Sequence, residues 1–416
     1  MEKNLIRHAQ NCRICDANDF DSVLHLTDTP LEDQYLPKKY LSIAQPTYPL
    51  KLIKCKACDY LFLSDSVDPN LSYENYIYKS NVTVGLKSHY EDYVISLINQ
   101  FLVPPNSLAL DLGSNDGSML LAFKKCGLIP LGIEPAAEIA KYSNLNGLET
   151  INNFFDQNTK DKIAKKYGLP YLITANYMLA NVDNLFEFTL NVKDLLDPSG
   201  IFVVQTGYHP DQFNKKMFDY IYHEHFSYFT LGVLKKLFLK SGLEIISAQK
   251  ESPKGGSLRI ISQKIGGPHK VSKNVDLILQ EELEKKVNTL EFFNKFDFEI
   301  KRSREILCSS LDKLKNFNKK IVGFGASHST TTLIYNFGLG KYLDYIVDDN
   351  PAKQNTFSPG LHIPVYSFEK IFEEFPDYIL ILSWQHADSI KNRHTDYLSI
   401  GGTWIEPLPK LIFFNS

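Results

Sequence analysis

The chain lacks a surplus of basic residues, a long apolar run and an apolar leader. Its 416 residues include 45 Lys and Arg against 48 Asp and Glu, which gives a formal net charge of −3. Because binding to nucleic-acid phosphates requires an excess of basic side chains, we expect no nucleic-acid partner. No run reaches the roughly 18 apolar residues of a membrane helix, and residues 1–10 are polar. We therefore expect no membrane contact and no secretory signal peptide.

Cysteine is also scarce. Six cysteines are too few to cross-link a chain of this length, which indicates a reducing, cytoplasmic compartment. The 44% of hydrophobic and 22% of charged residues are ordinary for a globular protein, so we expect no long disordered region. At about 150 residues per domain, the length predicts two to three domains. The sequence does not distinguish a monomer from a homodimer.

The cysteines that are present form a pattern. Four of the six lie in two Cys-x-x-Cys pairs, Cys12 with Cys15 and Cys55 with Cys58. Two such turns can complete a tetrahedral site of four sulfur ligands for Zn²⁺, and four thiolates leave no coordination position open to a substrate. We therefore predict a structural zinc ion in an N-terminal domain over residues 1–70. The alternatives are four unrelated buried thiols, or a redox pair, although neither pair begins a helix of a βαβ pattern.

A turn typical of nucleotide-binding folds follows the first strand of the central region. Residues 107–112 are apolar and strand-like, residues 118–126 have a helical pattern, and Asp111-Leu-Gly-Ser-Asn-Asp-Gly117 joins them. A strand, a glycine-rich turn and a helix form a nucleotide-binding unit. This turn lacks the third glycine of the dinucleotide pattern, and its acidic residues suit an amino-acid ammonium group better than a phosphate. Its candidate cofactor residues are Asp111, Gly113, Asn115, Asp116 and Gly117.

Glu134 ends the next expected strand, about 20 residues after that turn. An acidic side chain in this place binds a ribose diol. The turn and Glu134 together indicate S-adenosylmethionine as the cofactor. Asn176, which follows the third strand at 171–175, is a further candidate for this site.

Late strands complete the pattern of a methyltransferase sheet. We expect strands at 201–205, 243–248 and 257–263, and the turn with Gly255 and Gly256 between the last two looks like a closing hairpin. The predicted fold class is therefore α/β. It has a central class I methyltransferase sheet, Rossmann-like in form, within a domain over residues 71–265.

The loop after the strand at 201–205 carries an unusual density of tyrosine and histidine. It reads Phe218-Asp-Tyr-Ile-Tyr-His-Glu-His-Phe-Ser-Tyr-Phe229, and ligands in open α/β sheets bind at the carboxyl ends of strands. Histidine takes up a proton near neutral pH, and a tyrosine hydroxyl can donate to a developing oxyanion. In an extended segment His223 and His225 would share a face, so spacing does not choose the base. The alternatives are that these tyrosines and histidines only pack in the core, or that His223 and His225 bind a metal.

A second α/β unit follows a charged stretch of helical period at 271–319. Its first strand ends in a Gly-x-Gly turn formed by Gly323 and Gly325. Amides at the start of the next helix could hold a pyrophosphate, or the turn could merely pack strand on helix. We predict a helical linker and a C-terminal Rossmann-like, substrate-binding domain over residues 266–416. In this domain we expect strands at 320–326, 345–349 and 378–382, and a helix that starts near 327–332.

These motifs resemble the sugar C-methyltransferase family of deoxysugar biosynthesis. That family joins a zinc-binding domain, a methyltransferase domain and a C-terminal domain of its own, and the resemblance runs almost end to end. Besides the two cysteine pairs, it rests on the tyrosine-rich residues 73–79 before His89, and on residues 111–117, 222–225, 254–259 and 347–351.

The resemblance implies a reaction and a set of roles. The substrate would be a nucleotide-linked 4-keto-6-deoxy sugar, methylated at the carbon next to the ketone after a base removes the proton there. His225 would be the base, with Tyr222 and Glu224 beside it and Tyr76 reaching in from the preceding segment. The C-terminal domain would hold the nucleotide-sugar. The residues expected to bind this substrate are Tyr78, His223, Lys254, Arg259, Gly323 and Gly325.

The chain departs from the family at two places. Asn181 stands where the family has a catalytic histidine, and an amide can donate a hydrogen bond but cannot carry a proton at neutral pH. Asn181 remains a candidate catalytic residue, and His209 is a candidate replacement for the missing histidine. The family's usual lysine is also absent from residues 327–331. These departures leave two alternatives: O-methylation of a sugar hydroxyl, or a non-enzymatic scaffold of zinc and nucleotide folds.

Overall fold

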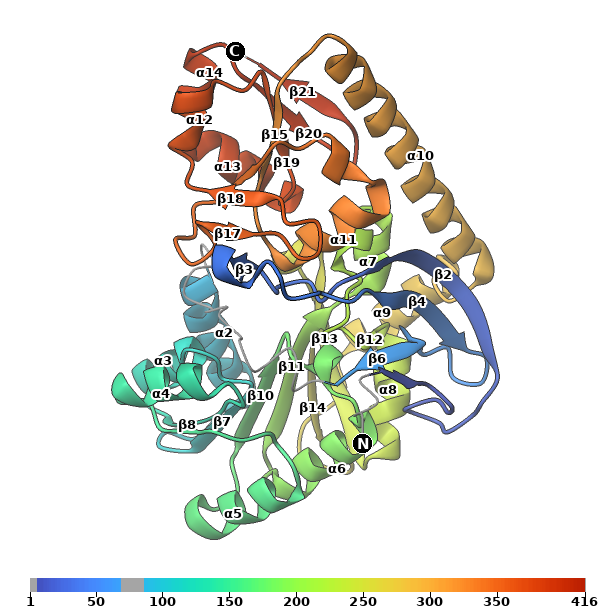
Figure 1. Cartoon of the computed structure of the whole chain (residues 1–416). Coiled ribbons are helices and arrows are strands. Elements are labelled where there is room, and N and C mark those ends of the chain that lie inside the picture. The colour runs from blue at the N-terminus through green and yellow to red at the C-terminus, as the bar shows by residue number, and fades with distance from the viewer. Residues whose placement is uncertain (1–5, 69–85, 416) are drawn as a thin grey trace.

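The computed structural model describes residues 6–68 and 86–415, which form three packed regions (Figure 1). The tyrosine-rich segment 73–79, with Tyr76 and Tyr78, lies outside the described residues. Among the helices of the described ranges, none has an apolar stretch long enough to cross a bilayer.

The central region is one seven-stranded sheet with the order β13-β14-β11-β10-β7-β8-β9. β14 is antiparallel to both of its neighbours, and the other pairs are parallel. This arrangement confirms the predicted α/β sheet and its six expected strands, and adds the two-residue β9. The strands are β7 (Leu108–Leu112), β8 (Ile129–Ile133), β9 (Thr150–Ile151), β10 (Leu172–Asn176), β11 (Ile201–Gly207), β13 (Leu243–Glu251) and β14 (Ser257–Lys264).

Helices cover both faces of this sheet, because its strands are apolar on both sides. Successive residues of β7 illustrate this, since Ala109 belongs to the core on one face and Leu110 to the core on the other. The first core includes residues of α2 (Leu86–Phe101) and α3 (Ser118–Lys125). The second includes residues of α5 (Gln157–Tyr167), α6 (Leu185–Leu195) and α8 (Leu231–Lys240). Two such cores leave the carboxyl ends of the strands as the place for a ligand.

The N-terminal region includes a strand from the histidine-rich loop. β12 (Ser227–Tyr228), which follows His225 in the chain, pairs with β5 at the edge of a sheet ordered β12-β5-β4-β2. Backbone hydrogen bonds therefore hold the histidine-rich loop against the N-terminal region. The other strands are β1 (Ile6–His8), β2 (Phe20–Thr29), β4 (Tyr48–Cys55), β5 (Leu61–Leu63) and β6 (Asp65–Val67), of which β1 and β6 pair with each other.

The predicted linker is a pair of helices, α9 (Lys273–Glu284) and α10 (Leu290–Asn316), and the latter runs along the outside of the molecule (Figure 1). Beyond it lies an eight-stranded sheet with the order β21-β20-β19-β15-β16-β18-β17-β3. Its edge strand β3 (Leu36–Pro37) comes from the N-terminal region.

The C-terminal sheet confirms the second Rossmann-like unit, because β15, β16, β18, β19 and β20 are parallel. Its own strands are β15 (Ile321–Phe324), β16 (Ile346–Val347), β17 (Thr356–Phe357), β18 (Pro364–Tyr366), β19 (Tyr378–Ile381), β20 (Thr403–Glu406) and β21 (Ile412–Phe414). Its helices are α11 (His328–Phe337), α12 (Lys370–Glu374), α13 (Ala387–Arg393) and α14 (Asp396–Ser399).

Candidate functional site

A cavity of about 340 Å³ lies at the carboxyl ends of β7, β8 and β10. This is where the topology of an open parallel sheet places a ligand. Four of the predicted cofactor residues line the cavity, and so does Asn181. The predicted residues that line it are Gly113, Asn115, Glu134, Asn176, Asn181 and Lys254.

Glu134 is held at the rim of this cavity by two backbone amides. Its Oε2 accepts a hydrogen bond from the amide of Asn115 at 2.9 Å, and its Oε1 accepts one from the amide of Ala136 at 2.9 Å. Burial raises the pKa of Glu134 above its ordinary value. Each carboxylate oxygen has a second lone pair, so the group can still accept hydrogen bonds from a ligand.

Asn176 lies next to the buried carboxyl of Asp111. It belongs to the lining of the cavity, and a hydrogen bond from its side chain helps to lower the pKa of Asp111 against the larger effect of burial.

Three residues of the predicted turn shape the site from outside the cavity. Asp111 is buried beneath the turn, where its Oδ1 accepts a hydrogen bond from Oγ1 of Thr174 at 2.5 Å and burial raises its pKa to about 7. Oδ1 of Asp116 accepts from the amide of Ser118 at 3.1 Å, at the start of α3. Gly117 has φ of +84°, and a Cβ there would lie 2.6 Å from Cδ1 of Leu148. These residues hold the turn and the helix start.

Gly113 is needed for the same turn and also borders the cavity. Its φ of +72° is a conformation that other residues rarely adopt, and an added Cβ would lie 3.2 Å from Cβ of Met178. The sequence did not identify several further residues of the lining. β9 has only two residues and therefore no alternating pattern to mark the loop after it. The unpredicted lining residues include Phe154, Asp156, Tyr177, Glu187 and Asn191.

A second, smaller cavity of about 30 Å³ contains His225 and adjoins the first. Tyr177 and Lys254 line both cavities, and Nζ of Lys254 lies 4.4 Å from the centre of the Tyr177 ring. The predicted base and the predicted cofactor residues therefore meet at one place. Tyr220 and Tyr228 also line the smaller cavity.

The hydrogen bonds of His225 identify its tautomer. Its Nδ1 lies 3.1 Å from the carbonyl oxygen of Tyr220, which can only accept, so Nδ1 carries the hydrogen. Its Nε2 lies 3.0 Å from the hydroxyl of Tyr222 and accepts from it. Burial lowers the pKa of His225 to about 4, so the ring is neutral at pH 7 with its lone pair on Nε2.

His223 points elsewhere. Residues 222–225 form a turn, in which the amide of His225 donates to the carbonyl of Tyr222 at 3.0 Å. The expectation that the two histidines share a face is therefore wrong. The ring of His223 is buried, with Nδ1 3.3 Å from Oε2 of Glu32 and Nε2 3.4 Å from the carbonyl oxygen of Tyr48. It lines neither cavity.

Glu224 belongs to the histidine-rich loop and faces the C-terminal domain. Its Oε1 is 3.9 Å from Nε2 of His328, the first residue of α11. Burial raises the pKa of Glu224 well above its ordinary value, and the nearby carboxylate of Glu32 acts in the same direction.

Arg259 and His209 do not reach the cavities. Arg259 contacts Glu251 at 3.0 Å and His89 at 3.2 Å in a network within the protein. His209 is 1% exposed and packs against the rings of Phe213 and Phe293. The proposal that His209 replaces the missing histidine is therefore wrong.

The Gly-x-Gly turn of the C-terminal domain already holds an anion of the chain itself. The amide of Ala326 donates to Oδ2 of Asp348 at 2.6 Å. A Cβ at Gly323 would lie 2.6 Å from Cδ1 of Leu382, so this glycine serves the packing of β15. Gly325 has φ of +105°, which the turn requires. Neither glycine lines the two cavities.

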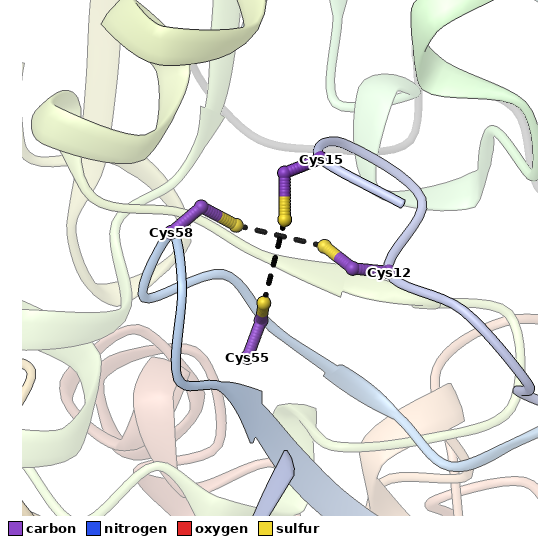
Figure 2. Close-up of side chains that lie close together, drawn as sticks. All are labelled: Cys12, Cys15, Cys55 and Cys58. Carbon is purple, nitrogen blue, oxygen red and sulfur yellow. Dashed lines mark hydrogen bonds between the residues drawn. The ribbon is translucent and has the colours of Figure 1, made fainter. Parts of the chain in front are cut away.

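The four predicted zinc ligands converge on one point (Figure 2). Their sulfur atoms lie within 4.8 Å of one another, with Cys12 and Cys58 at 3.5 Å and Cys15 and Cys55 at 3.5 Å. Zn–S bonds of about 2.3 Å in a tetrahedron place sulfur atoms about 3.8 Å apart, so the cluster fits a zinc ion. The ligands come from the loop before β2 and from the turn between β4 and β5.

Three family models match successive parts of the chain. A zinc binding domain matches residues 12–73, a methyltransferase domain residues 86–248, and a C-methyltransferase C-terminal domain residues 252–409. The C-methyltransferase NovU from Streptomyces niveus is 28% identical over 409 residues, which are 98% of this chain and 97% of NovU.

Solved structures resemble only part of the chain. Magnesium protoporphyrin IX methyltransferase from Synechocystis, solved with bound S-adenosylmethionine, aligns with a TM-score of 0.34 and 11% identity over 47% of this chain and 88% of its own. An S-adenosylmethionine-dependent methyltransferase from Clostridium acetobutylicum aligns with a TM-score of 0.33 and 11% identity over 44% and 92%.

Proposed function

We propose that this chain methylates a nucleotide-linked keto-deoxysugar, because successive parts of it match a zinc binding domain, a methyltransferase domain and a C-methyltransferase C-terminal domain, and it is similar to a C-methyltransferase along its length. The methyl donor is S-adenosylmethionine. In the proposed reaction the methyl group is added to the carbon next to the ketone. The match to a C-methyltransferase along the whole chain argues against a non-enzymatic scaffold.

The larger cavity supplies the groups that this cofactor requires. Glu134 presents carboxylate oxygens for the ribose hydroxyls, and Asn176 lines the same cavity. Bound S-adenosylmethionine supplies an electrophilic methyl group on a positively charged sulfur atom. Fixed protein dipoles in place of bulk water would favour transfer of that methyl group, because the reaction removes the charge.

The position of His225 carries the proposal. It lines the cavity that shares Tyr177 and Lys254 with the cofactor cavity, and its Nδ1 is held by the carbonyl of Tyr220. In the proposed reaction, Nε2 takes the proton from the carbon next to the ketone, and the electron pair left behind forms an enolate. That carbon would then take up the methyl group as the sulfur–methyl bond of bound S-adenosylmethionine breaks, which leaves a neutral thioether. The hydroxyl of Tyr222, which is bonded to Nε2, is a candidate donor for the developing oxyanion.

Asn181 favours a second candidate function, O-methylation of a sugar hydroxyl. It lines the cofactor cavity where the family's catalytic histidine would stand, and it cannot carry a proton. With an alcohol as substrate His225 would remove a proton from oxygen, and a second proton carrier would not be needed.

Deuterium exchange separates these two functions. We expect the enzyme with S-adenosylhomocysteine in D₂O to introduce deuterium at the carbon next to the ketone, because only C-methylation passes through an enolate. Nuclear magnetic resonance of the recovered nucleotide-sugar measures this exchange, and the His225→Ala variant is the control without a base. Absence of exchange, together with a product methylated on oxygen, would establish the second function instead.

Glu134→Ala should weaken the binding of S-adenosylmethionine by about 1.5–3 kcal/mol, the range for a hydrogen bond to a charged group. Isothermal titration calorimetry measures the change. The matched control is Glu138→Ala, because Glu138 lies in the adjoining α4 (Ala137–Leu145) with its side chain 87% exposed. An unchanged affinity in folded Glu134→Ala protein would refute the assignment.

A further inference from the structure

A carboxylate of the N-terminal region reaches the histidine-rich loop. Glu32 lies in the segment between β2 and β4 and is 1% exposed. Its Oε1 accepts a hydrogen bond from the backbone amide of Glu224 at 2.9 Å, and its Oε2 is 3.3 Å from Nδ1 of His223. Both oxygens of this one side chain are therefore bonded to the turn that ends at His225.

The segment that carries Glu32 is anchored independently of that loop. The carbonyl of Glu32 accepts a hydrogen bond from Oγ1 of Thr331 at 2.8 Å. The next residue, Asp33, forms a 2.5 Å ion pair with Lys353. A few residues later, β3 joins the edge of the C-terminal sheet. The position of Glu32 is thus determined by the C-terminal domain as well as by its own region.

Glu32 faces a ring whose two nitrogens both lie near acceptors, the Glu32 carboxylate and the Tyr48 carbonyl. Burial opposes a charge on Glu32, but the hydrogen bonds from His223 and from the Glu224 amide hold its pKa below the ordinary value. A buried carboxylate with complete hydrogen bonding is a rigid support, because each displaced bond leaves an unpaired group.

We propose that Glu32 is a positioning residue, which holds the turn at 222–225 and with it the ring of His225 at the smaller cavity beside the cofactor cavity. This inference rests on the proposed role of His225 as the base. Glu32 acts through the amide of Glu224 and the ring of His223. The N-terminal region therefore contributes to the active site as well as to the zinc centre.

Glu32→Ala should lower kcat by about 10- to 100-fold, the scale of a displaced catalytic group. The dissociation constant of S-adenosylmethionine should stay the same, because Glu32 does not line the cofactor cavity. The matched control is Gln45→Ala in the same segment. Its Oε1 accepts from the amide of Gly360 at 2.8 Å, away from the loop, and we expect its kcat to be unchanged. Glu32→Gln, which has the same size, should lose less of its kcat. It serves as the test variant if Glu32→Ala does not fold.

Two further measurements distinguish positioning from a general structural role. Amide hydrogen exchange of the peptide with residues 222–225 should rise in Glu32→Ala and not in Gln45→Ala. In a His225→Ala background, Glu32→Ala should cause no further loss of residual turnover, because the group it positions is absent. Unchanged exchange at the turn, or additive losses, would overturn the inference.

The His225→Ala variant, measured alongside, distinguishes a failure of the proposed base from a failure of the proposed role of Glu32. If His225→Ala is inactive while Glu32→Ala has full activity, the inference about Glu32 fails by itself. If His225→Ala has full activity, the proposed base fails, whatever Glu32 does.

Discussion

His225→Ala should lower turnover by at least about 100-fold, the low end of the range for a lost general base. The reason is that His225 lines the cavity beside the cofactor cavity, with its tautomer set by the carbonyl of Tyr220. Binding of S-adenosylmethionine should survive, because the turn at Gly113 and the carboxylate of Glu134 are untouched. Steady-state kinetics and calorimetry measure the two effects separately.

His223→Ala is the matched control for this result. The two histidines are two residues apart, but the ring of His223 contacts Glu32 and Tyr48 and lines neither cavity. Its loss should therefore cost less turnover than the loss of His225. The reverse order of effects would assign the base to His223. Full activity of both variants would mean that the proton leaves by another route.

The pH profile gives an independent test of His225. Burial lowers its pKa to about 4, so the lone pair on Nε2 is lost only as the pH falls through that value. We expect kcat/KM to fall at acid pH with a midpoint near that value, well below the ordinary pKa of histidine, about 6.5. If kcat/KM instead falls to half near pH 6.5, with the slope of a single protonation, the result would contradict the buried environment of His225.

The second large effect concerns the zinc centre. Each chain should contain one zinc ion, and Cys12→Ser should abolish accumulation of folded protein rather than reduce turnover selectively. The physical reason is that metal binding and folding are coupled, with about 10–16 kcal/mol of apparent binding free energy in isolated zinc-finger peptides. Cys12, Cys55 and Cys58 are part of the same buried core as strands of the central sheet, so loss of the metal reaches beyond the N-terminal region.

Metal analysis of purified protein and thermal unfolding with and without a chelator measure this prediction. Cys126→Ser and Cys308→Ser are matched controls, because these two cysteines lie outside the four-sulfur cluster. They should retain one zinc ion per chain. Well under one zinc ion per chain in the unaltered protein would contradict the assignment.

Several features could be predicted from the sequence because local patterns carry them. The strands of the central sheet appear as short apolar runs, and their order along the chain places Glu134 and Asn176 at the same edge of the sheet as Gly113. The two Cys-x-x-Cys turns each present two sulfur atoms by their own geometry. Their convergence (Figure 2) was therefore predictable from spacing and chemistry alone.

Other predicted residues fulfil a different physical need from the expected one. Asp116 bonds to the amide of Ser118 at the helix start, and Gly323 makes room for Leu382. A carboxylate that binds a ligand and one that bonds to a helix start occupy the same sequence pattern. Only the neighbouring atoms distinguish them.

The sequence by itself determined the architecture, the turn at Gly113 and the cluster of four cysteines, because each depends on residues close together in the chain or on strand order. Only the tertiary structure placed His223 and His225 in different surroundings. The environment of His223 comes from Glu32 and Tyr48, more than 170 residues away, and that of His225 comes from Tyr220 and Tyr222 through a turn that breaks the expected alternation. No periodic pattern records contacts over such separations, and the state of a buried histidine depends on which acceptors the fold brings to its two nitrogens.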